Sequence, residues 1–215
     1  MHAAMSSIHL ELLGKDRLSI FQRLRTFKQN GYLAGGTALA LQIQHRKSFD
    51  FDVFVNRPIS NKLRLAITRT FGSQTYTVNT EDQLTFSLGD ISGITFLWYY
   101  WKPIAPLIST DSLDIASVLD IAADKAHTLG RRAVWRDYVD LFVLLKEYGM
   151  TIGSIIQAAQ KKFQGDFVKT QFIEQLGYFG DVTVAPVEYI HTSYSEKEIQ
   201  SYLETQVSEY LSCIL

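Results

Sequence analysis

The stretch YLAGGTALALQIQHRKSFDFDVF, residues 32–54, decides the expected fold. Its first three residues are apolar and predict a short buried strand, and the adjacent glycines Gly35 and Gly36 require a turn. Thr37 is a good N-cap for the short apolar helix that residues 38–44 predict. The first half of the stretch therefore predicts a strand, a glycine turn and a helix in direct succession.

The second half of the stretch alternates between apolar and polar residues, as a strand does. The apolar face is expected to hold Phe49, Phe51 and Val53, and the polar face Ser48, Asp50 and Asp52. Because residues two apart on a strand are about 7 Å from each other, the two carboxylates can share one or two divalent cations. Mg²⁺ binds through one or two carboxylates plus phosphates and water, and Mn²⁺ takes similar ligands, so this pair is a candidate metal site.

The glycine turn is a candidate phosphate site. A turn without side chains lets backbone N–H groups approach phosphate oxygens, and the positive end of the following helix favours an anion. The Thr37 hydroxyl adds a donor. Arg46 and Ser48 flank the acidic strand and are candidates for a phosphate or metal-water contact, with a loop hydrogen bond as the alternative. Taken singly, a glycine pair or an Asp-x-Asp strand is most often structural, and it is their order and spacing that indicate a site.

Outside this stretch, the residue pattern divides the chain into a sheet-rich half and a helical half. Strands are expected at 75–78, 83–88 and 94–101, pairing antiparallel beside the acidic strand. Helices are expected at 16–30, 59–71, 116–129, 135–148, 151–163 and 195–211. The predicted fold is α/β (α+β in a stricter sense), with a mixed β-sheet core flanked by helices in residues 1–108. Residues 109–215 form a mainly helical region that is expected to close the active-site cleft.

Composition excludes several classes of protein. With 215 residues, 47% of them hydrophobic, the chain can bury one sizeable core. Because 21 basic residues face 22 acidic ones, a coat protein of long nucleic-acid tracts is excluded. The single cysteine, Cys213, excludes an internal disulfide, is expected to be a small buried group, and favours the reducing cytoplasm. Neither a membrane-spanning run nor an export signal is expected.

Two motifs resemble a known family. Residues 32–41 and 45–54 are similar to the glycine turn and paired-acid strand of the DNA polymerase β nucleotidyltransferase superfamily. They resemble more closely the signature of AbiEii-type abortive-infection nucleotidyltransferases, the toxin half of certain bacterial toxin–antitoxin pairs. Residues 119–126 and 136–145 are similar to that family's helical motif, in which a lysine and a later aspartate are functional. The resemblance covers roughly residues 16–148.

This resemblance implies nucleotidyl transfer from a nucleoside triphosphate (NTP). The implied catalytic residues are Asp50, Asp52, Lys125 and Asp140, with Mg²⁺ (or Mn²⁺) on the first two. The implied nucleotide-binding residues are Gly35, Gly36, Thr37, Arg46, Ser48 and Lys125, where Lys125 reaches the triphosphate from an apolar wall. The implied acceptor is an RNA end, such as the 3′ end of tRNA, or a protein hydroxyl. A cognate antitoxin is the implied protein partner.

The second motif leaves the identity of its acid open. Asp137 lies three residues before Asp140, so the two are neighbours on one helix face. One of them can serve as the acid or base, and the other is then expected to pair with an arginine. The candidate arginines are Arg131, Arg132 and Arg136. We favour Asp140 for the chemistry.

The chain departs from the superfamily on its later strand, because residues 94–99 offer no third carboxylate. Either Asp140 takes that part or the chemistry is slower. The departure keeps open a catalytically degenerate module that binds a nucleotide or a partner protein. An aminoglycoside-modifying enzyme is the third alternative, although the cluster of arginines suits an anionic acceptor better than a cationic drug. The aromatic run 98–101 is expected to be sheet core rather than a base-stacking platform.

Overall fold

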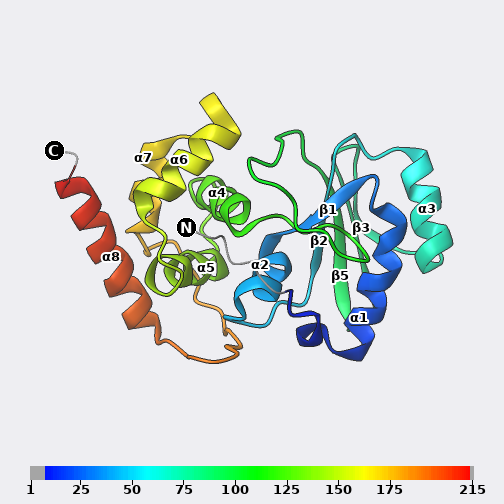
Figure 1. Ribbon diagram of the computed structural model, residues 1–215, viewed down its shortest axis with the longest axis horizontal. Coiled ribbons are helices and arrows are strands. Elements are labelled where there is room, and N and C mark those ends of the chain that lie inside the picture. The colour runs from blue at the N-terminus through cyan, green and yellow to red at the C-terminus, as the bar shows by residue number, and fades with distance from the viewer. Residues whose placement is uncertain (1–7, 214–215) are drawn as a thin grey trace. The chain divides into compact units, whose positions relative to one another are not determined.

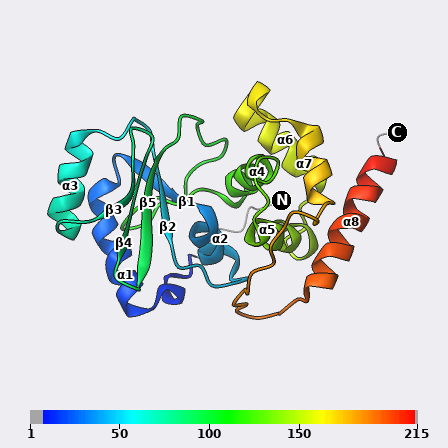
Figure 2. The same ribbon diagram turned by 180° about the vertical axis from the view of Figure 1, so that it is seen from behind.

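The structure is a computed structural model that describes residues 8–213. The chain divides into two compact units. The first contains the residues up to Lys102 together with Pro106–Ser117, and the second contains Pro103–Ala105 together with the residues from Val118 onward. The first unit is a sheet with helices and the second consists of helices (Figures 1 and 2).

The first unit is built on a five-stranded mixed sheet, as predicted, with the order β1-β2-β5-β4-β3. The strands are β1 Gly31–Ala34, β2 Phe51–Val55, β3 Tyr76–Asn79, β4 Gln83–Leu88 and β5 Ser92–Trp98. The β1–β2, β3–β4 and β4–β5 pairs are antiparallel, whereas β2 and β5 run parallel. The predicted antiparallel pairing is thus confirmed among the three later strands, whereas the contact of β5 with the acidic strand is parallel. The chain returns to β2 through a helix and two further strands rather than through a hairpin, and such a crossover permits a parallel neighbour.

Helices lie on both faces of this sheet. They are α1 Gly14–Arg23, α2 Gly35–Ile43 and α3 Asn61–Phe71, with short 3-10 turns at Leu10–Leu13 and Leu24–Phe27. Helices α1 and α3 lie on one face and α2 lies on the other (Figures 1 and 2). Three ring pairs join the α1 and α3 side to the strands: Phe21 with Phe51, Phe27 with Phe96, and Phe71 with Phe86. The predicted helices 16–30 and 59–71 are confirmed, the first with a tighter final turn.

Residues Pro106–Ser117 return to the first unit and run along the outer edge of β1. Leu33 forms a parallel bridge with Ile115. The Leu33 N–H donates to the Asp114 carbonyl oxygen and the Ala116 N–H donates to the Leu33 carbonyl oxygen, each at 2.8 Å. The backbone of this segment thus pairs with a strand whose other side already pairs with β2.

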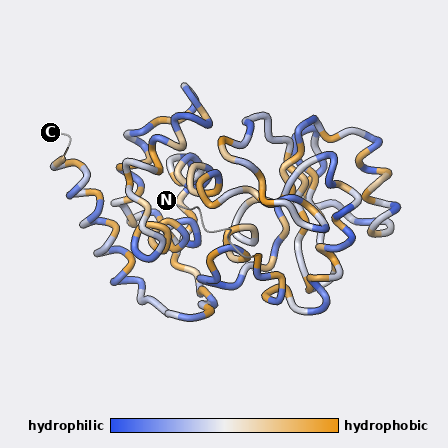
Figure 3. Tube along the Cα trace, in the orientation of Figure 1, coloured by the Kyte–Doolittle hydropathy of each residue, from blue (hydrophilic) through white to orange (hydrophobic). Residues whose placement is uncertain are grey.

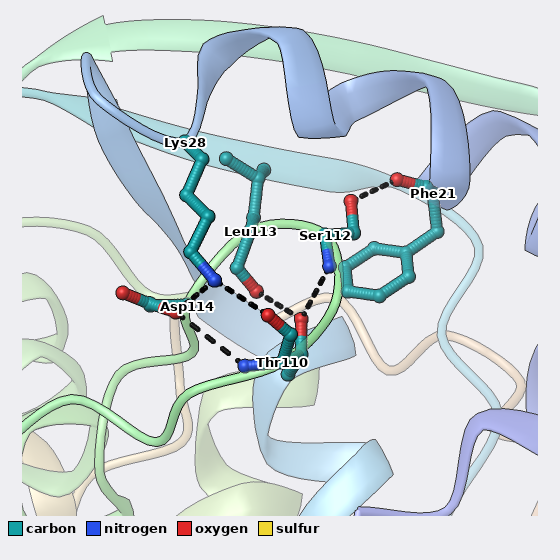
Figure 4. Close-up of polar contacts among 6 residues, drawn as sticks. All are labelled: Phe21, Lys28, Thr110, Ser112, Leu113 and Asp114. Carbon is teal, nitrogen blue, oxygen red and sulfur yellow. Dashed lines mark hydrogen bonds and ion pairs between the residues drawn. The ribbon is translucent and has the colours of Figure 1, made fainter.

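Polar side chains hold the same segment in place (Figure 4). Lys28 Nζ lies 3.1 Å from Asp114 Oδ1 and also donates to the Thr110 carbonyl oxygen. The buried Ser112 hydroxyl donates to the carbonyl oxygen of Phe21 in α1. The returning segment is therefore bound to the first unit through side chains as well as through backbone.

The second unit consists of α4 Val118–Leu129, α5 Trp135–Lys146, α6 Ile152–Phe163, α7 Lys169–Leu176 and α8 Glu196–Ser212. Hydrophobic and hydrophilic residues alternate along α8 (Figure 3), as in an amphipathic helix. Thr151 and Ser195 each form a capping box at the start of α6 and α8. Cys213 is exposed, so the prediction that it is buried is wrong. Among residues 8–213, no helix has the length and apolar character needed to cross a membrane.

Candidate functional site

The two glycines of the turn begin α2 and are packed against the acidic strand. Gly35 has a φ of +69°, in the left-handed region, and a Cβ atom on it would collide with the Asp52 carboxylate. A Cβ atom on Gly36 would lie 2.8 Å from Arg46 Nη2 and 3.1 Å from Ser48 Oγ. A side chain at Gly35 is disfavoured by both the left-handed φ and the Asp52 carboxylate, whereas a side chain at Gly36 would displace the ends of the Arg46 and Ser48 side chains.

Thr37 lies inside the first turn of α2, so the prediction that it is the N-cap is wrong. The helix begins at Gly35 and Ala34 occupies the N-cap position. The buried Thr37 hydroxyl instead donates to the Asp50 carbonyl oxygen and lies 3.0 Å from Ser48 Oγ. The helix starts three residues early because the glycines turn directly from strand to helix, and its N-cap residue Ala34 makes no side-chain capping bond.

Asp50 and Asp52 lie at the start of β2. Asp52 is the second residue of the strand and is half-buried, whereas Asp50 precedes the strand and is exposed. Asp50 Oδ1 accepts a hydrogen bond of 3.1 Å from the Gly93 N–H. Since Phe51 and Val53 are fully buried on one face of β2, strand alternation places Asp52 on the other face, and Asp50 is exposed just before the strand.

The alternation predicted Phe49 on the buried face with Phe51 and Val53, and this prediction is wrong. Phe49 is 41% exposed, and the Arg17 guanidinium lies over its ring at 4.9 Å. The reason is that β2 begins only at Phe51, so the alternation does not extend back to residue 49.

The position opposite Asp52 on the neighbouring strand is Thr95. The parallel register of β2 and β5 pairs these two residues directly. Strand β5, on which the third carboxylate of the superfamily is missing, is thus the immediate neighbour of the acidic strand β2. Among residues 8–213, no group of three or more His, Cys, Asp or Glu side chains is placed to hold a metal ion. The two aspartates still suit Mg²⁺, which binds through one or two carboxylates together with phosphates and water.

The second unit contains the lysine and aspartate of the helical motif. Lys125 on α4 is only 11% exposed. Its Nζ lies 2.7 Å from Asp140 Oδ2 and also forms an ion pair with Asp137, both on α5. Lys125 was expected to lie against apolar side chains, but its ammonium group instead pairs with two carboxylates. Asp137 Oδ2 is buried without a hydrogen-bond partner in the described part of the chain.

The arginines of the α4–α5 connection do not supply the expected partner of Asp137. Lys125 supplies it, and Arg131 donates to the Asp166 carbonyl oxygen at 3.2 Å. Arg132 and Arg136 are exposed. The spacing of three residues correctly places Asp137 and Asp140 side by side, but it cannot reveal which cation lies across from them.

A second buried ion cluster was missed in the sequence. Lys162 on α6 is fully buried, with its Nζ 3.1 Å from Asp120 Oδ1 and 2.7 Å from Asp124 Oδ1. Asp120 also accepts hydrogen bonds from the N–H groups of Ile104 and Ala105, at 2.9 and 3.2 Å. The available signal was the spacing of four between two acids in an otherwise apolar helix. This cluster ties the segment 103–105 to α4 and has a structural role.

The aromatic run 98–101 is not sheet core, so that prediction is wrong. Tyr100 is 59% exposed, and Trp98, Tyr99 and Trp101 are half-exposed. The strand ends at Trp98, and the following residues are no longer covered by a neighbouring strand on both sides.

Comparison with known proteins gives concordant results. Residues 20–211 match the family model described as the nucleotidyl transferase AbiEii toxin of a type IV toxin–antitoxin system. A protein of Aquifex aeolicus without an assigned function is 29% identical over 187 residues, which cover 84% of this chain and 87% of that protein.

Two solved structures are similar over 96% of the chain. MenT4, a nucleotidyltransferase toxin of Mycobacterium tuberculosis, has a TM-score of 0.58 at 15% identity, with 89% of its chain covered. An H. pylori protein described as a candidate nucleotidyltransferase has a TM-score of 0.55 at 14% identity, with 96% of its chain covered. At these identities the two structures show a shared fold.

Proposed function

The chain belongs to the AbiEii family of nucleotidyltransferase toxins, and on this basis we propose that it is an Mg²⁺-dependent (or Mn²⁺-dependent) enzyme that moves a nucleoside monophosphate from an NTP to an acceptor hydroxyl. Membership of the family implies an NTP substrate and a cognate antitoxin. The acceptor we propose is an RNA end, such as the 3′ end of tRNA, or a protein hydroxyl. The observation that carries the proposal is the close approach of the glycine turn to Asp52, Arg46 and Ser48.

The turn is the proposed site of the β and γ phosphates. The N-cap residue of α2, Ala34, makes no side-chain capping bond, and the first N–H groups of a helix bind phosphate oxygens. The Arg46 guanidinium lies beside Gly36, where its Nη1 donates to the Lys47 carbonyl oxygen at 3.0 Å. A guanidinium fixed in this way next to a side-chain-free turn supplies positive charge to a triphosphate. Ser48 Oγ adds a hydroxyl on the same side of the turn.

Asp50 and Asp52 are the proposed metal ligands. A divalent ion held there would neutralise phosphate charge and stabilise both the attacking and the leaving oxygen. The Gly93 N–H, bonded to Asp50 Oδ1, orients that carboxylate, and the absence of a side chain on Gly35 leaves room for the other. Asp50 is exposed just before β2, and Asp52 is half-buried beside the glycine turn.

Lys125 and Asp140, on α4 and α5 of the second unit, are further residues that we propose for catalysis. Family resemblance supports Lys125 as a phosphate contact and Asp140 as the group that accepts the proton of the acceptor hydroxyl. An ammonium group has three donors, and its ion pairs with Asp137 and Asp140 fix its direction.

The test is transfer of label from α-³²P-labelled NTPs, with Mg²⁺, to total RNA or to lysate protein. We expect one class of labelled macromolecule, and nuclease or protease digestion then shows which acceptor it is. Asp50→Asn and Asp52→Asn should each abolish labelling, as should removal of the metal by EDTA. Asp90→Asn, at an exposed turn aspartate, is the matched control and should remain active. NTP binding without any labelled product would instead support the non-catalytic module.

A further inference from the structure

We propose that Tyr99 and Trp101, backed by Phe54, form the surface on which the base of the donor nucleotide stacks. We call these three residues the aromatic ledge. This inference rests on the proposed function, because it assumes that an NTP binds with its phosphates at the glycine turn. It assigns a binding surface to the base, whereas the turn and the two aspartates account only for the phosphates and the metal.

The aromatic ledge lies on the same face of the sheet as Asp52. Phe54 comes two residues after Asp52 on β2, so strand alternation points both side chains the same way. Phe51 and Val53 are fully buried on the opposite face. Two residues along a strand correspond to about 7 Å, so the ledge begins within a nucleotide's length of the proposed metal ligands.

The rings of the ledge are held in a fixed arrangement. The Tyr99 N–H donates to the Val55 carbonyl oxygen at 2.8 Å, which continues the pairing with β2 one residue past the end of β5. The Tyr99 ring is stacked on Phe54 with centroids 4.1 Å apart, and Trp101 meets Tyr99 edge-on at 5.2 Å. Phe54 is 9% exposed, whereas Tyr99 and Trp101 are half-exposed. The inner ring thus supports two outer rings that are partly exposed, and the Tyr100 ring packs on Trp101 with centroids 4.0 Å apart.

The residues before and along β2 follow one another in an order that parallels the groups of an NTP. Arg46 and Ser48, beside the glycine turn, precede the strand, Asp50 and Asp52 stand at its start, and the aromatic ledge lies at its end. An NTP has its β and γ phosphates at one end, the α-phosphate and sugar between, and the base at the other end. Aromatic side chains stack on the faces of bases, so the ledge suits the end that carries the base.

The test compares two ligands that differ by the nucleoside. Binding of α,β-methylene analogues of the four NTPs and of inorganic tripolyphosphate is measured by calorimetry with Mg²⁺. Loss of a stacking partner weakens nucleic-acid binding by about 1–3 kcal/mol per base, which is roughly a five- to hundredfold change in Kd. We therefore expect Tyr99→Leu and Trp101→Leu to weaken binding of the NTP analogue by about tenfold and to leave binding of tripolyphosphate unchanged.

Two variants serve as controls. Tyr99→Phe keeps the ring and should bind the analogue like the wild type. Tyr148→Leu removes a 49% exposed ring on the second unit, outside the ledge, and should change the Kd by less than about twofold. As a second readout, the NTP analogue should quench the fluorescence of Trp101 while tripolyphosphate should not, and this difference should disappear in Trp101→Phe.

The outcomes separate this inference from the function on which it rests. If the wild type fails to bind tripolyphosphate, the proposed phosphate site is wrong. If tripolyphosphate binds normally but Tyr99→Leu leaves the Kd of the analogue unchanged, only the stacking site is wrong. A variant that instead raises the KM of the acceptor would assign the ledge to the acceptor and would also overturn the inference. Equal loss of both ligands in Tyr99→Leu and in Trp101→Leu would indicate general damage to the site and would likewise contradict it.

Discussion

At the scale of single residues, Lys125 is held between two carboxylates that would lose their counter-charge without it. Asp137 and Asp140 are 5% and 0% exposed. Breaking a buried ion pair by removing one partner typically costs 3–5 kcal/mol, because the remaining charge stays buried. We therefore expect Lys125→Met to lower the free energy of unfolding by about 3 kcal/mol, measured by urea denaturation.

A rescue variant separates this effect from catalysis. Lys125→Met combined with Asp137→Asn and Asp140→Asn carries no uncompensated charge, and it should recover more than half of the lost stability. Activity should not recover with it, because both proposed catalytic groups are gone. Recovery of nucleotidyl transfer in this triple variant would contradict the proposed roles of Lys125 and Asp140.

Gly35 combines two constraints that a matched variant can separate. Its φ of +69° and the nearby Asp52 carboxylate both disfavour a side chain. Gly149 has a similar φ of +72° but has no atom within 4 Å of a Cβ position. Gly149→Ala should therefore show the backbone cost alone, about 1 kcal/mol, while Gly35→Ala should lose more and also lose NTP binding. Thermal denaturation and calorimetry check this, and equal effects of the two changes would count against the close approach at Asp52.

Sequence reasoning worked best where the residue type itself requires a geometry. The glycine pair and the alternating acids predicted a turn packed beside an acidic strand, and the structure brings Gly36, Arg46 and Ser48 together. It failed where a side chain has alternative partners. Thr37 could cap the helix or bond to the strand, and Lys125 could face a phosphate or an acid. Such choices depend on contacts between residues that are distant in the chain.

At the scale of elements, α4 and α6 are joined by a histidine that stays neutral. The ring of His127 is stacked on that of Phe163, with centroids 3.9 Å apart. Burial, and then the charge of Arg131, lowers the pKa of His127 to about 4, with a smaller contribution from Lys162 and an opposing one from Asp166. In the unfolded chain the same group has a pKa near 6.5.

This pKa shift predicts a pH dependence of stability. Between pH 6.5 and pH 4 the unfolded chain takes up a proton that the folded chain does not, so stability falls as the pH is lowered through this window. We expect a loss on the order of 2 kcal/mol that is attributable to His127. His127→Gln, measured by urea denaturation at pH 7 and pH 4.5, should lose less stability than the wild type over this range. An identical fall in both proteins would contradict the assignment.

Elements with a strong local signal were predicted, and those defined by distant neighbours were not. The helices expected at 151–163 and 195–211 are confirmed, and each is preceded by a capping box, at Thr151 and at Ser195. Helix α7 has only eight residues and lies partly in a stretch without a clear period. The parallel pairing of β5 with β2 was missed because hydrophobic alternation describes a strand's faces but not its direction.

At the scale of the whole molecule, the chain passes between the two units three times, and the short segment Pro103–Ala105 belongs to the helical unit. The Asp120 carboxylate holds it through the N–H groups of Ile104 and Ala105. Asp120 is in turn paired with the fully buried Lys162. Lys162→Met leaves Asp120 and Asp124 buried without this counter-charge.

We expect this variant to loosen one unit selectively. Amide hydrogen exchange of Ile104, Ala105 and α4 should accelerate, whereas the amides of β2 and β5 should keep their protection. Lys161→Met, which changes the exposed neighbour on the same helix, is the control and should leave exchange unchanged. Uniform acceleration in both units would mean that they unfold as one body.

The returning segment 106–117 also determines how the sheet meets other chains. A strand at the edge of a sheet presents unpaired backbone groups that can template aggregation. Residues 114–116 occupy that edge of β1, while the opposite edge is formed by β3, a strand of four residues with an irregular register near Tyr76 and Val78. Both features discourage intermolecular strand addition, one by blocking the edge and the other by keeping it short and bent. A fragment that stopped at Lys102 would keep every strand of the sheet but would expose the outer edge of β1. The last part of the first unit therefore contributes to solubility rather than adding a strand.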